Sequence, residues 1–373
     1  MPGDDRRSGP GPAGHAPGEH VPGGHALGEH APGGDPRGDR PPAVRLQSLL
    51  DGMRVTKVLH VLAELKVADH LADGPRDVPA LARDVGADPD ALYRVLRCAA
   101  SYGVFAETPD GRFGLTSMAE LLRSDVEQSH RDLVMLVGGD LWWRPYEELA
   151  YAVRTGRSAA EHVFGRPFYA HLRSDAEASA RFDRAMTQMS LAQARAILAR
   201  YSFAGYRRIA DIGGGHGYFL SQVLLSSPDT EGLLFDQEHV VAGAGPVLDK
   251  HGVADRTTVV AGDFFTEIPG GCDAYLLKAI LINWPDDRAV RILRAVRAAI
   301  GEAPGARLFV IEPVVAPGNA RDYSKALDVD MLVNLGGRQR TTEEWRRLIA
   351  EGGFELIGEP APGRREVLEC RPR

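Results

Sequence analysis

The C-terminal half of the chain alternates short apolar runs with amphipathic stretches. The runs are rich in Ile, Val, Leu and Phe, as is typical of buried strands, and the stretches between them have helical spacing. Strands that alternate with helices form a parallel, doubly wound sheet that binds ligand at the carboxyl ends of its strands. We therefore predict an α/β domain over 201–373. The predicted strands are 209–212, 233–236, 257–265, 273 to the turn at Pro285, and 307–315, with a closing hairpin over 354–370 and helices over 217–227, 286–300 and 342–352.

Residues 43–122 are predicted to form a mainly helical domain. The stretch 44–72 carries apolar residues on more than one face, so we expect one face to be buried in a second copy of the chain, as a homodimer. Residues 78–105 have the pattern of a helix-turn-helix, and a small wing follows. A DNA-binding winged helix is the alternative, but Arg94 and Arg97 have no wider basic stripe around them and the net charge is −7.

Residues 1–42 have a different composition, dominated by Gly, Pro and His. With almost no large apolar side chains, this tail cannot offset the entropy cost of ordering, and we predict disorder. Histidines recur every fifth residue at His15, His20, His25 and His30. They could chelate a metal weakly, but a low-complexity extension is the simpler interpretation.

The remaining composition narrows the class of protein. Cys98, Cys272 and Cys370 are scattered and form neither a disulfide framework nor a zinc spacing. The sequence has no run of the length of a membrane span and no signal peptide, so a cytoplasmic location is the default. The acidic net charge gives no footprint for nucleic acid, and no metal site is expected.

The segment RRIADIGGGHGYFL (207–220) is the most informative motif. A strand that carries Asp211 leads into a turn containing Gly213 and Gly215, and a helix follows. Glycines there allow a sharp turn and close approach of a ligand to the backbone. An acid ahead of the turn disfavours a phosphate and suits a ligand with hydroxyls or a positive charge. S-adenosylmethionine carries both.

Two later strands also end in candidate ligand-binding residues. Asp236 follows the glycine turn by about twenty residues, the offset at which a carboxylate meets a ribose diol. Asp263 and Phe264 end the third predicted strand, where the carboxylate could accept from an adenine amine and the ring could pack on the purine.

In these motifs the chain resembles the class I S-adenosylmethionine-dependent O-methyltransferases of the plant phenolic and bacterial polyketide type. From about Val44 onward, DIGGGHG, LFDQEHV, GDFF, LLKAILINWPDD and GGRQRTTEEW occur in the family's order. The resemblance implies a Rossmann-like domain preceded by a winged-helix-like dimerisation domain. It further implies that Gly213 and Gly215 approach the methionine end of the cofactor, Asp236 the ribose and Lys278 the rim, while Asp263 and Phe264 frame the adenine.

Residues 123–200 are predicted to bridge the two domains and to line a substrate pocket. Aromatic and Met stripes more often belong to a core than to a pocket, but the family position favours the pocket for several of them. A flat aromatic substrate suits such a lining. The predicted substrate-binding residues are Trp143, Phe168, Phe182 and Met186, together with Met331 and Asn334 from the later segment DMLVNLGG.

The chain departs from the family at the residue that acts as base. Phenol methyltransferases of this type have LKxxxHDW after the fourth strand, where the histidine removes the phenolic proton. Here Ile282 stands in place of the histidine and Asn283 in place of the acid. Of the two orienting carboxylates, Glu312 is kept and Gln339 replaces the other. Because Ile cannot accept a proton, Asn283 and Glu312 are the remaining catalytic candidates.

We therefore predict an O-methyltransferase that acts on an aromatic, polyketide-like secondary metabolite, largely through proximity and orientation. The Ile-Asn-Trp-Pro segment is similar to that of anthracycline-type enzymes. An enzyme of this fold that binds the cofactor without methylating, as a hydroxylase, decarboxylase or cyclase, is the alternative, and a winged-helix regulator is a third. His162 and His171 could each act as a relocated base, but a surface or structural role is the favoured interpretation for both, and His216 is expected near the cofactor as a residue at the start of a helix.

Overall fold

The computed structural model describes residues 41–303 and 305–373. The chain divides between Asp51 and Gly52, inside helix α1 (Pro42–Glu64), and the described part of the first unit is the beginning of that helix. The predicted tail, with its four histidines, lies outside the described residues up to position 40, and α1 already begins at Pro42.

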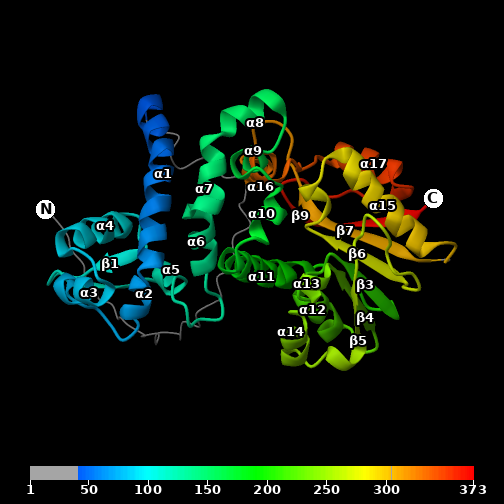
Figure 1. Cartoon of the computed structure of the whole chain (residues 1–373), viewed down its shortest axis with the longest axis horizontal. Helices are drawn as coiled ribbons and strands as arrows, with labels where there is room; N and C mark the ends of the chain where they lie inside the picture. The colour runs from blue at the N-terminus through cyan, green and yellow to red at the C-terminus, as the bar shows by residue number, and fades with distance from the viewer. Residues whose placement is uncertain (1–40, 304) are drawn as a thin grey trace, which may run out of the picture. The chain divides into compact units, whose positions relative to one another are not determined.

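The second unit contains a seven-stranded sheet in the order β5-β4-β3-β6-β7-β9-β8 (Figure 1). Neighbouring strands from β5 to β7 are parallel, and β9 runs antiparallel to both β7 and β8. The chain thus starts in the middle of the sheet at β3, winds outward to β5, and returns to the other side at β6. The strands are β3 (Arg208–Ile212), β4 (Glu231–Asp236), β5 (Thr257–Ala261), β6 (Ala274–Lys278), β7 (Arg307–Val314), β8 (Phe354–Leu356) and β9 (Arg364–Pro372).

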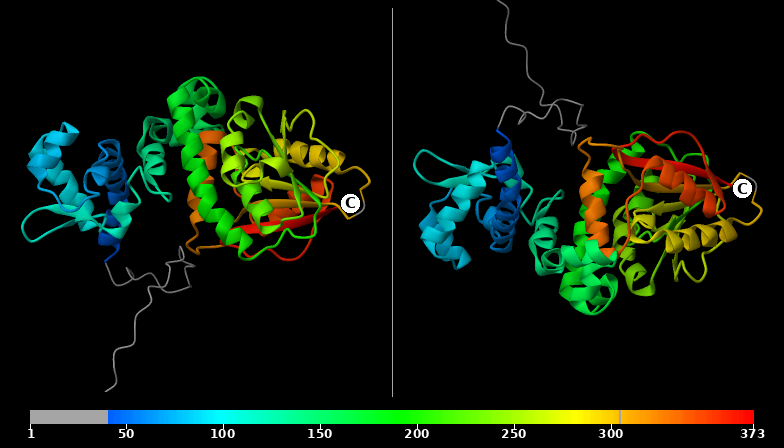
Figure 2. Two further views of the ribbon diagram at one scale, coloured as in Figure 1. Left: turned by 90° about the horizontal axis from the view of Figure 1, so that it is seen from below. Right: turned by 90° about the horizontal axis from the view of Figure 1, so that it is seen from above.

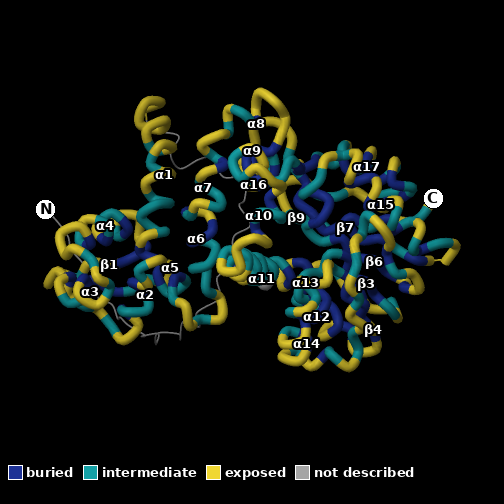
Figure 3. The backbone as a smooth tube through the Cα atoms, in the orientation of Figure 1, coloured by how far each residue is buried: buried dark blue, intermediate teal, exposed yellow. Residues whose placement is uncertain are grey.

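Alternate residues of the strands pack into two separate cores, one on each face of the sheet. Ala210 and Ile212 of β3 join the core that α15 and α17 cover, and Ile209 joins the core that α11 and α12 cover. Figure 3 shows the inner strands as the most buried part of this unit, and in both views of Figure 2 the red C-terminal segment closes one edge of the sheet. The helices of this domain are α12 (Tyr218–Ser226), α13 (Glu238–Val241), α14 (Gly245–Lys250), α15 (Asp286–Ile300), α16 (Tyr323–Asp330) and α17 (Thr342–Glu351), with 3-10 turns η1 (Ala254–Arg256) and η2 (Leu281–Asn283) and a π-helical segment η3 (Met331–Leu335).

The helix-turn-helix and its wing are present as predicted. Asp77 and Asp88 cap the two helices by accepting backbone N–H bonds, and two short antiparallel strands follow. The long apolar stretch is not one helix, because Lys66 takes a left-handed conformation after α1. The elements are α2 (Val67–His70), α3 (Val78–Val85), α4 (Pro89–Ser101), β1 (Phe105–Glu107), β2 (Phe113–Leu115) and α5 (Ser117–Glu120).

Helices fill the segment between this region and the sheet. The longest, α11, packs against α6 and α12, so it connects the helical region to the sheet domain. The helices are α6 (Arg131–Gly138), α7 (Asp140–Glu147), α8 (Leu149–Thr155), α9 (Ala159–Phe164), α10 (Phe168–Leu172) and α11 (Ala176–Leu198).

Two of the observed strands are shorter than predicted. Strand β5 ends at Ala261, so Asp263 and Phe264 lie in the turn that follows it. Strand β6 ends at Lys278, where Ala279 adopts a positive φ of 56°, and the rest of the apolar run forms η2. In both places the apolar run continues past the strand because the turn is itself packed against the core. The short helices α13 and α14 had no predicted counterpart.

Candidate cofactor and substrate site

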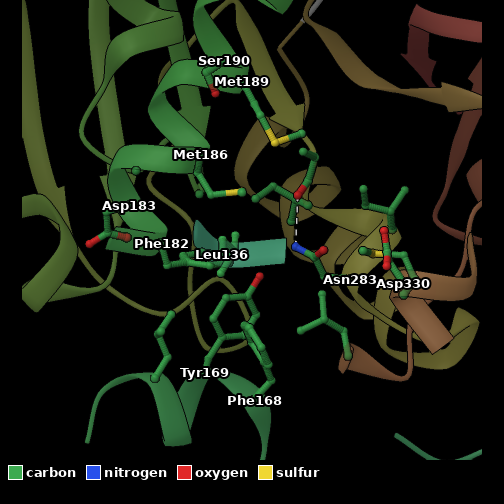
Figure 4. Close-up of a pocket in the computed structure, with 18 of the residues that line it drawn as sticks. Leu136, Phe168, Tyr169, Phe182, Asp183, Met186, Met189, Ser190, Asn283 and Asp330 are labelled. Carbon is green, nitrogen blue, oxygen red and sulfur yellow. Dashed lines mark hydrogen bonds between the residues drawn. The ribbon is translucent and has the colours of Figure 1, made fainter. Parts of the chain in front are cut away.

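A cavity of ≈ 1050 Å³ opens at the carboxyl ends of β3, β4 and β6. Strand order reverses between β3 and β6, which is where doubly wound sheets bind their ligands. Helices α7, α10 and α11 supply many of its aromatic and Met side chains. Figure 4 shows Met186 and Met189 reaching from α11, and Phe168 and Tyr169 from α10, towards the same space.

The glycine turn brings the backbone to the wall of this cavity. Gly213 and Gly215 have φ values of 72° and 61°, which L side chains rarely adopt. A Cβ on Gly213 would lie 2.5 Å from Cδ1 of Ile280, so no other residue fits there without a shift. The turn is also held from the neighbouring strand, since the Gly215 N–H donates to Asp236 Oδ2 at 2.9 Å.

Asp236 ends β4 with both carboxylate oxygens engaged by backbone N–H groups. The second bond comes from Gln237 and reaches Oδ1 at 2.7 Å. Burial raises the pKa of Asp236, and these backbone bonds act in the opposite direction. The carboxylate therefore has a fixed orientation at the cavity wall, as a ligand with adjacent hydroxyls requires.

Two oppositely charged side chains lie deeper, below the glycine turn. Asp211 is buried, its Oδ2 has no hydrogen-bond partner among the described residues, and burial raises its pKa to about 7. Lys278 donates to the Ser190 hydroxyl at 3.1 Å, and burial lowers its pKa to about 8. Both line the cavity. An orphaned carboxylate oxygen at this depth favours a cationic or hydrogen-bond-donating ligand.

Asp263 and Phe264 line the cavity from the turn after β5. Asp263 Oδ1 accepts from the Phe265 N–H at 2.8 Å, which fixes the turn. Phe264, Phe265 and Trp284 meet edge to face. The flat ring of an adenine is a suitable partner for this aromatic group.

The turn after β6 carries Ile282 and Asn283 to the cavity. Asn283 Nδ2 donates to the Ala279 carbonyl at 3.0 Å, a bond drawn in Figure 4, which fixes the side chain against its own turn. Ile282 is buried and part of the core. At the position of the family's histidine, the cavity wall therefore presents an aliphatic side chain and, beside it, a primary amide.

Glu312 holds this turn without reaching the cavity. It is fully buried at the end of β7, and its Oε1 accepts from the backbone N–H groups of Ile280 and Leu281 at 2.9 and 3.0 Å. Arg365 lies 3.4 Å from Oε2. Burial raises the pKa of Glu312 to about 7. Glu312 is not among the residues that line the cavity, and its contacts are with the backbone of the turn and with Arg365.

Arg340 braces the same turn from the other side. Its guanidinium is buried, donates to the carbonyls of Leu281 and Trp284, and pairs with Asp286. The neighbouring Gly337 packs so closely that a Cβ there would lie 2.1 Å from the Ile282 carbonyl oxygen. These contacts leave the turn little freedom.

The predicted substrate residues mostly gather on the aromatic wall. Phe168 meets Trp142, Tyr169 and Phe182 edge to face, at centroid separations of 5.6 to 5.9 Å. Trp143 lies under Lys57, whose Nζ is 4.2 Å from the ring centroid. Met186, Met331 and Tyr169 also line the cavity.

Asn334 does not belong to this lining. It lies inside the π-helical segment η3, fully buried, with both side-chain polar atoms unpartnered among the described residues. Its carbonyl accepts from the Ser158 hydroxyl, which ties η3 to α9. The side chain that faces the cavity from the following loop is Gln339, a buried amide whose two polar atoms also have no partner in the described chain.

The histidines lie in two kinds of surroundings. His162 stacks on Tyr151 and His171 on Phe164, and neither lines the cavity. His216 and His239 do line it. The described residues contain no group of three or more His, Cys, Asp or Glu side chains placed to hold a metal ion.

Comparison with known proteins agrees with this geometry. Residues 146–355 match the model of an O-methyltransferase domain, and residues 47–125 match that of an O-methyltransferase dimerisation domain. A phenazine O-methyltransferase of Lysobacter antibioticus is 39% identical, over 88% of this chain and 95% of its own length. An 8-amino-8-demethylriboflavin N,N-dimethyltransferase of Streptomyces davaonensis is 38% identical, over 89% and 96%.

A more distant relative and a solved structure are also similar to this chain. The aclacinomycin 10-hydroxylase of Streptomyces purpurascens is 32% identical, over 82% of each chain. An O-methyltransferase from neocarzinostatin biosynthesis, solved with S-adenosylmethionine and 2-hydroxy-5-methyl naphthoic acid, superposes with a TM-score of 0.75 at 32% identity, covering 88% of this chain and 98% of its own.

The glycine cradle, the oriented Asp236 carboxylate and the orphaned Asp211 oxygen fit S-adenosylmethionine, which is the cofactor of this family. Among the described residues, no helix is both long and apolar enough to cross a membrane. On the match to both family models and on the relatives that span nearly its whole length, the chain belongs to the S-adenosylmethionine-dependent O-methyltransferases.

Proposed function

We propose that the enzyme methylates a hydroxyl group on an aromatic, polyketide-like secondary metabolite, and that it does so without a histidine base. The observation that carries the proposal is the wall formed by Ile282 and Asn283 at the place where the family's base would stand. The aromatic and Met lining of the same cavity supports a flat, largely apolar acceptor.

The proposed roles of the cofactor-binding residues follow from their places. Gly213 and Gly215 admit the methionine part of the cofactor against the backbone, and Asp236 accepts from the ribose hydroxyls. Asp263 and Phe264 enclose the adenine. Asp211 and Lys278 set the charge below the reacting end, with Asp211 favouring the sulfonium. When bound, S-adenosylmethionine supplies a methyl group on a positively charged sulfur, whose C–S bond breaks as the new C–O bond forms.

The chain itself then has to position the acceptor oxygen. Glu312 and Arg340 fix the backbone of the turn, and Asn283 is fixed by its bond to Ala279. Nδ2 of Asn283 keeps one N–H free for the acceptor oxygen, and Oδ1 can accept from a neutral hydroxyl. Orientation of this kind supplies a large part of the rate enhancement in a displacement reaction, whereas a general base typically adds about 10²–10⁴-fold.

Without a strong base, the acceptor must lose its proton to water. We therefore propose a phenol made acidic by a neighbouring carbonyl or quinone. Relatives support this class of acceptor, since their names include a phenazine, a mitomycin and a 2,7-dihydroxy-5-methyl-1-naphthoate. They also support a place in antibiotic biosynthesis.

We further propose that the enzyme is a homodimer. Helix α1 exposes several large apolar side chains, and the dimerisation model matches from residue 47. So many exposed large apolar side chains on one helix are unusual in a monomer. The exposed side chains are Val44, Leu46, Leu49, Leu50 and Met53.

The test is to incubate the enzyme with S-adenosylmethionine labelled in its methyl group and a panel of hydroxynaphthoquinones and simple naphthols. Label should pass to the acidic phenols and only slowly to the naphthols. An enzyme that consumes no cofactor while it hydroxylates or decarboxylates its substrate would support the alternative, which the 32% identical hydroxylase keeps open. Retention of all label on the cofactor with every acceptor would overturn the proposal.

A further inference from the structure

One carboxylate on the cavity wall has an oxygen left for a ligand. Asp330, the last residue of α16, lines the cavity and is drawn in Figure 4. Trp142 Nε1 donates to its Oδ1 at 3.0 Å, and the Tyr146 hydroxyl donates to the same atom at 2.5 Å. Within the described part of the chain, Oδ2 takes part in no hydrogen bond or ion pair.

The two donors fix the direction of this carboxylate. An indole N–H can only donate, so Asp330 Oδ1 is always the acceptor in its bond with Trp142. Burial and the bond to Asp330 raise the pKa of Tyr146, so this phenol also stays a donor at any ordinary pH. Both come from α7, whereas Asp330 is on α16, so the bonds hold two cavity walls together with Oδ1 between them.

The segment around Asp330 contributes mainly apolar side chains to the cavity. The nearest cavity-lining side chains on its own segment are Tyr323, Leu327 and Met331. No described Lys, Arg or His forms a salt bridge with it. Asp330 is half-buried, so a ligand that fills the cavity and displaces water from Oδ2 has to bring a donor or a positive charge to this oxygen.

We propose that Asp330 determines substrate specificity by accepting, at Oδ2, a hydrogen bond from a protonated amine on the aromatic substrate. A charge-assisted bond is stronger than one from a neutral hydroxyl. This inference rests on the proposed function, because it assumes that an aromatic acceptor occupies the cavity.

Two naphthols that differ in one group provide the test: 5-(aminomethyl)-1-naphthol, which is protonated at pH 7, and the neutral 5-(hydroxymethyl)-1-naphthol. Their affinities are measured by calorimetry in the presence of saturating S-adenosylhomocysteine, so that no methyl transfer is needed. The wild type should bind the amine about tenfold more tightly or better. In Asp330→Asn the preference should fall to within about threefold, because the amide keeps an acceptor for Trp142 and Tyr146 but loses the charge.

Two further variants separate charge from structure. Tyr146→Phe removes one donor but leaves the carboxylate, so it should keep the preference for the amine. Asp183→Asn removes another half-buried cavity carboxylate, one that accepts no hydrogen bond from a side chain in the described residues, and should also keep it. Equal binding of both naphthols by the wild type, or an unchanged preference in Asp330→Asn, would overturn the inference.

Failure of the proposed function would look different. An enzyme that prefers the amine but transfers no methyl group to any phenol would contradict the proposed function and leave the role of Asp330 standing. An enzyme that methylates acidic phenols but shows no preference would contradict the role of Asp330 alone.

Discussion

The role of Glu312 can be tested by two substitutions that differ only in what they leave behind. Glu312 Oε1 accepts two backbone N–H bonds that hold the turn carrying Ile282 and Asn283. Glu312→Ala leaves both buried N–H groups unpartnered, at about 1–3 kcal/mol each, so we expect about 2–6 kcal/mol of destabilisation and a large loss of turnover. Glu312→Gln keeps an acceptor in the same place.

For Glu312→Gln we therefore expect turnover within about threefold of the wild type and a stability loss of about 1 kcal/mol. Arg365, which faces Oε2, still donates to the Ile311 carbonyl at 3.0 Å. Turnover by the methyl-transfer assay and stability by thermal unfolding together decide the matter. If Glu312→Gln folds as stably as expected but loses as much turnover as Glu312→Ala, Glu312 takes part in proton transfer and the positioning role is wrong.

The titration of Glu312 gives an independent control. Burial raises its pKa to about 7, so the protonated form is favoured in the folded state. A raised pKa in the folded state means that this contribution to stability is lost as pH rises from about 4.5 to about 7. The wild type should therefore lose stability over that range relative to Glu312→Gln, as measured by denaturant unfolding at pH 5 and pH 8. Parallel pH profiles would show that Glu312 does not titrate there.

Two further predictions concern the cavity. Ile282→His should not raise turnover on an acidic phenol, because the phenol oxygen needs no base and the site is packed around an aliphatic side chain. Asn283→Ala should lower turnover by roughly 5- to 150-fold, which corresponds to about 1–3 kcal/mol in the barrier. A gain of turnover in Ile282→His would contradict the base-free site. Between pH 6 and pH 9, Asp211 gains its negative charge and Lys278 loses its positive one, so affinity for cationic S-adenosylmethionine should rise relative to neutral S-adenosylhomocysteine. A unit charge about 8 Å away at an effective dielectric of about 20 contributes about 2 kcal/mol, roughly thirtyfold, and the two changes act in the same direction. Calorimetry with both ligands checks it, and an affinity ratio that does not change with pH would refute it.

The sheet and its cofactor end were predictable because each depends on local pattern. The strands ending at Ile212 and Asp236 were predicted with their observed ends, and parallel strands necessarily bring such ends to one edge. The glycine spacing predicted the turn, and the structure shows why Gly213 is needed there: Ile280 fills the space of a side chain.

The substrate side was harder to predict because its contacts join distant parts of the chain. Trp142 and Asp330 are separated by 188 positions, and no sequence pattern links them. Glu312 was identified by its place at the end of a strand, but only the structure shows that backbone groups use its carboxylate. Asn334 lies buried inside the π-helical segment η3 and is not among the cavity-lining residues, a placement that no local sequence pattern indicates.

The central claim, methyl transfer without an enzyme base, is tested most directly by the pH dependence of a single turnover with two phenols of different acidity. The account predicts that the rising limb of the rate moves with the pKa of the phenol, and that Ala substitutions at the cavity histidines His216 and His239 do not remove it. A limb fixed near about 6.5 for both phenols, and lost in one of these variants, would show that a histidine acts as the base and would contradict the account.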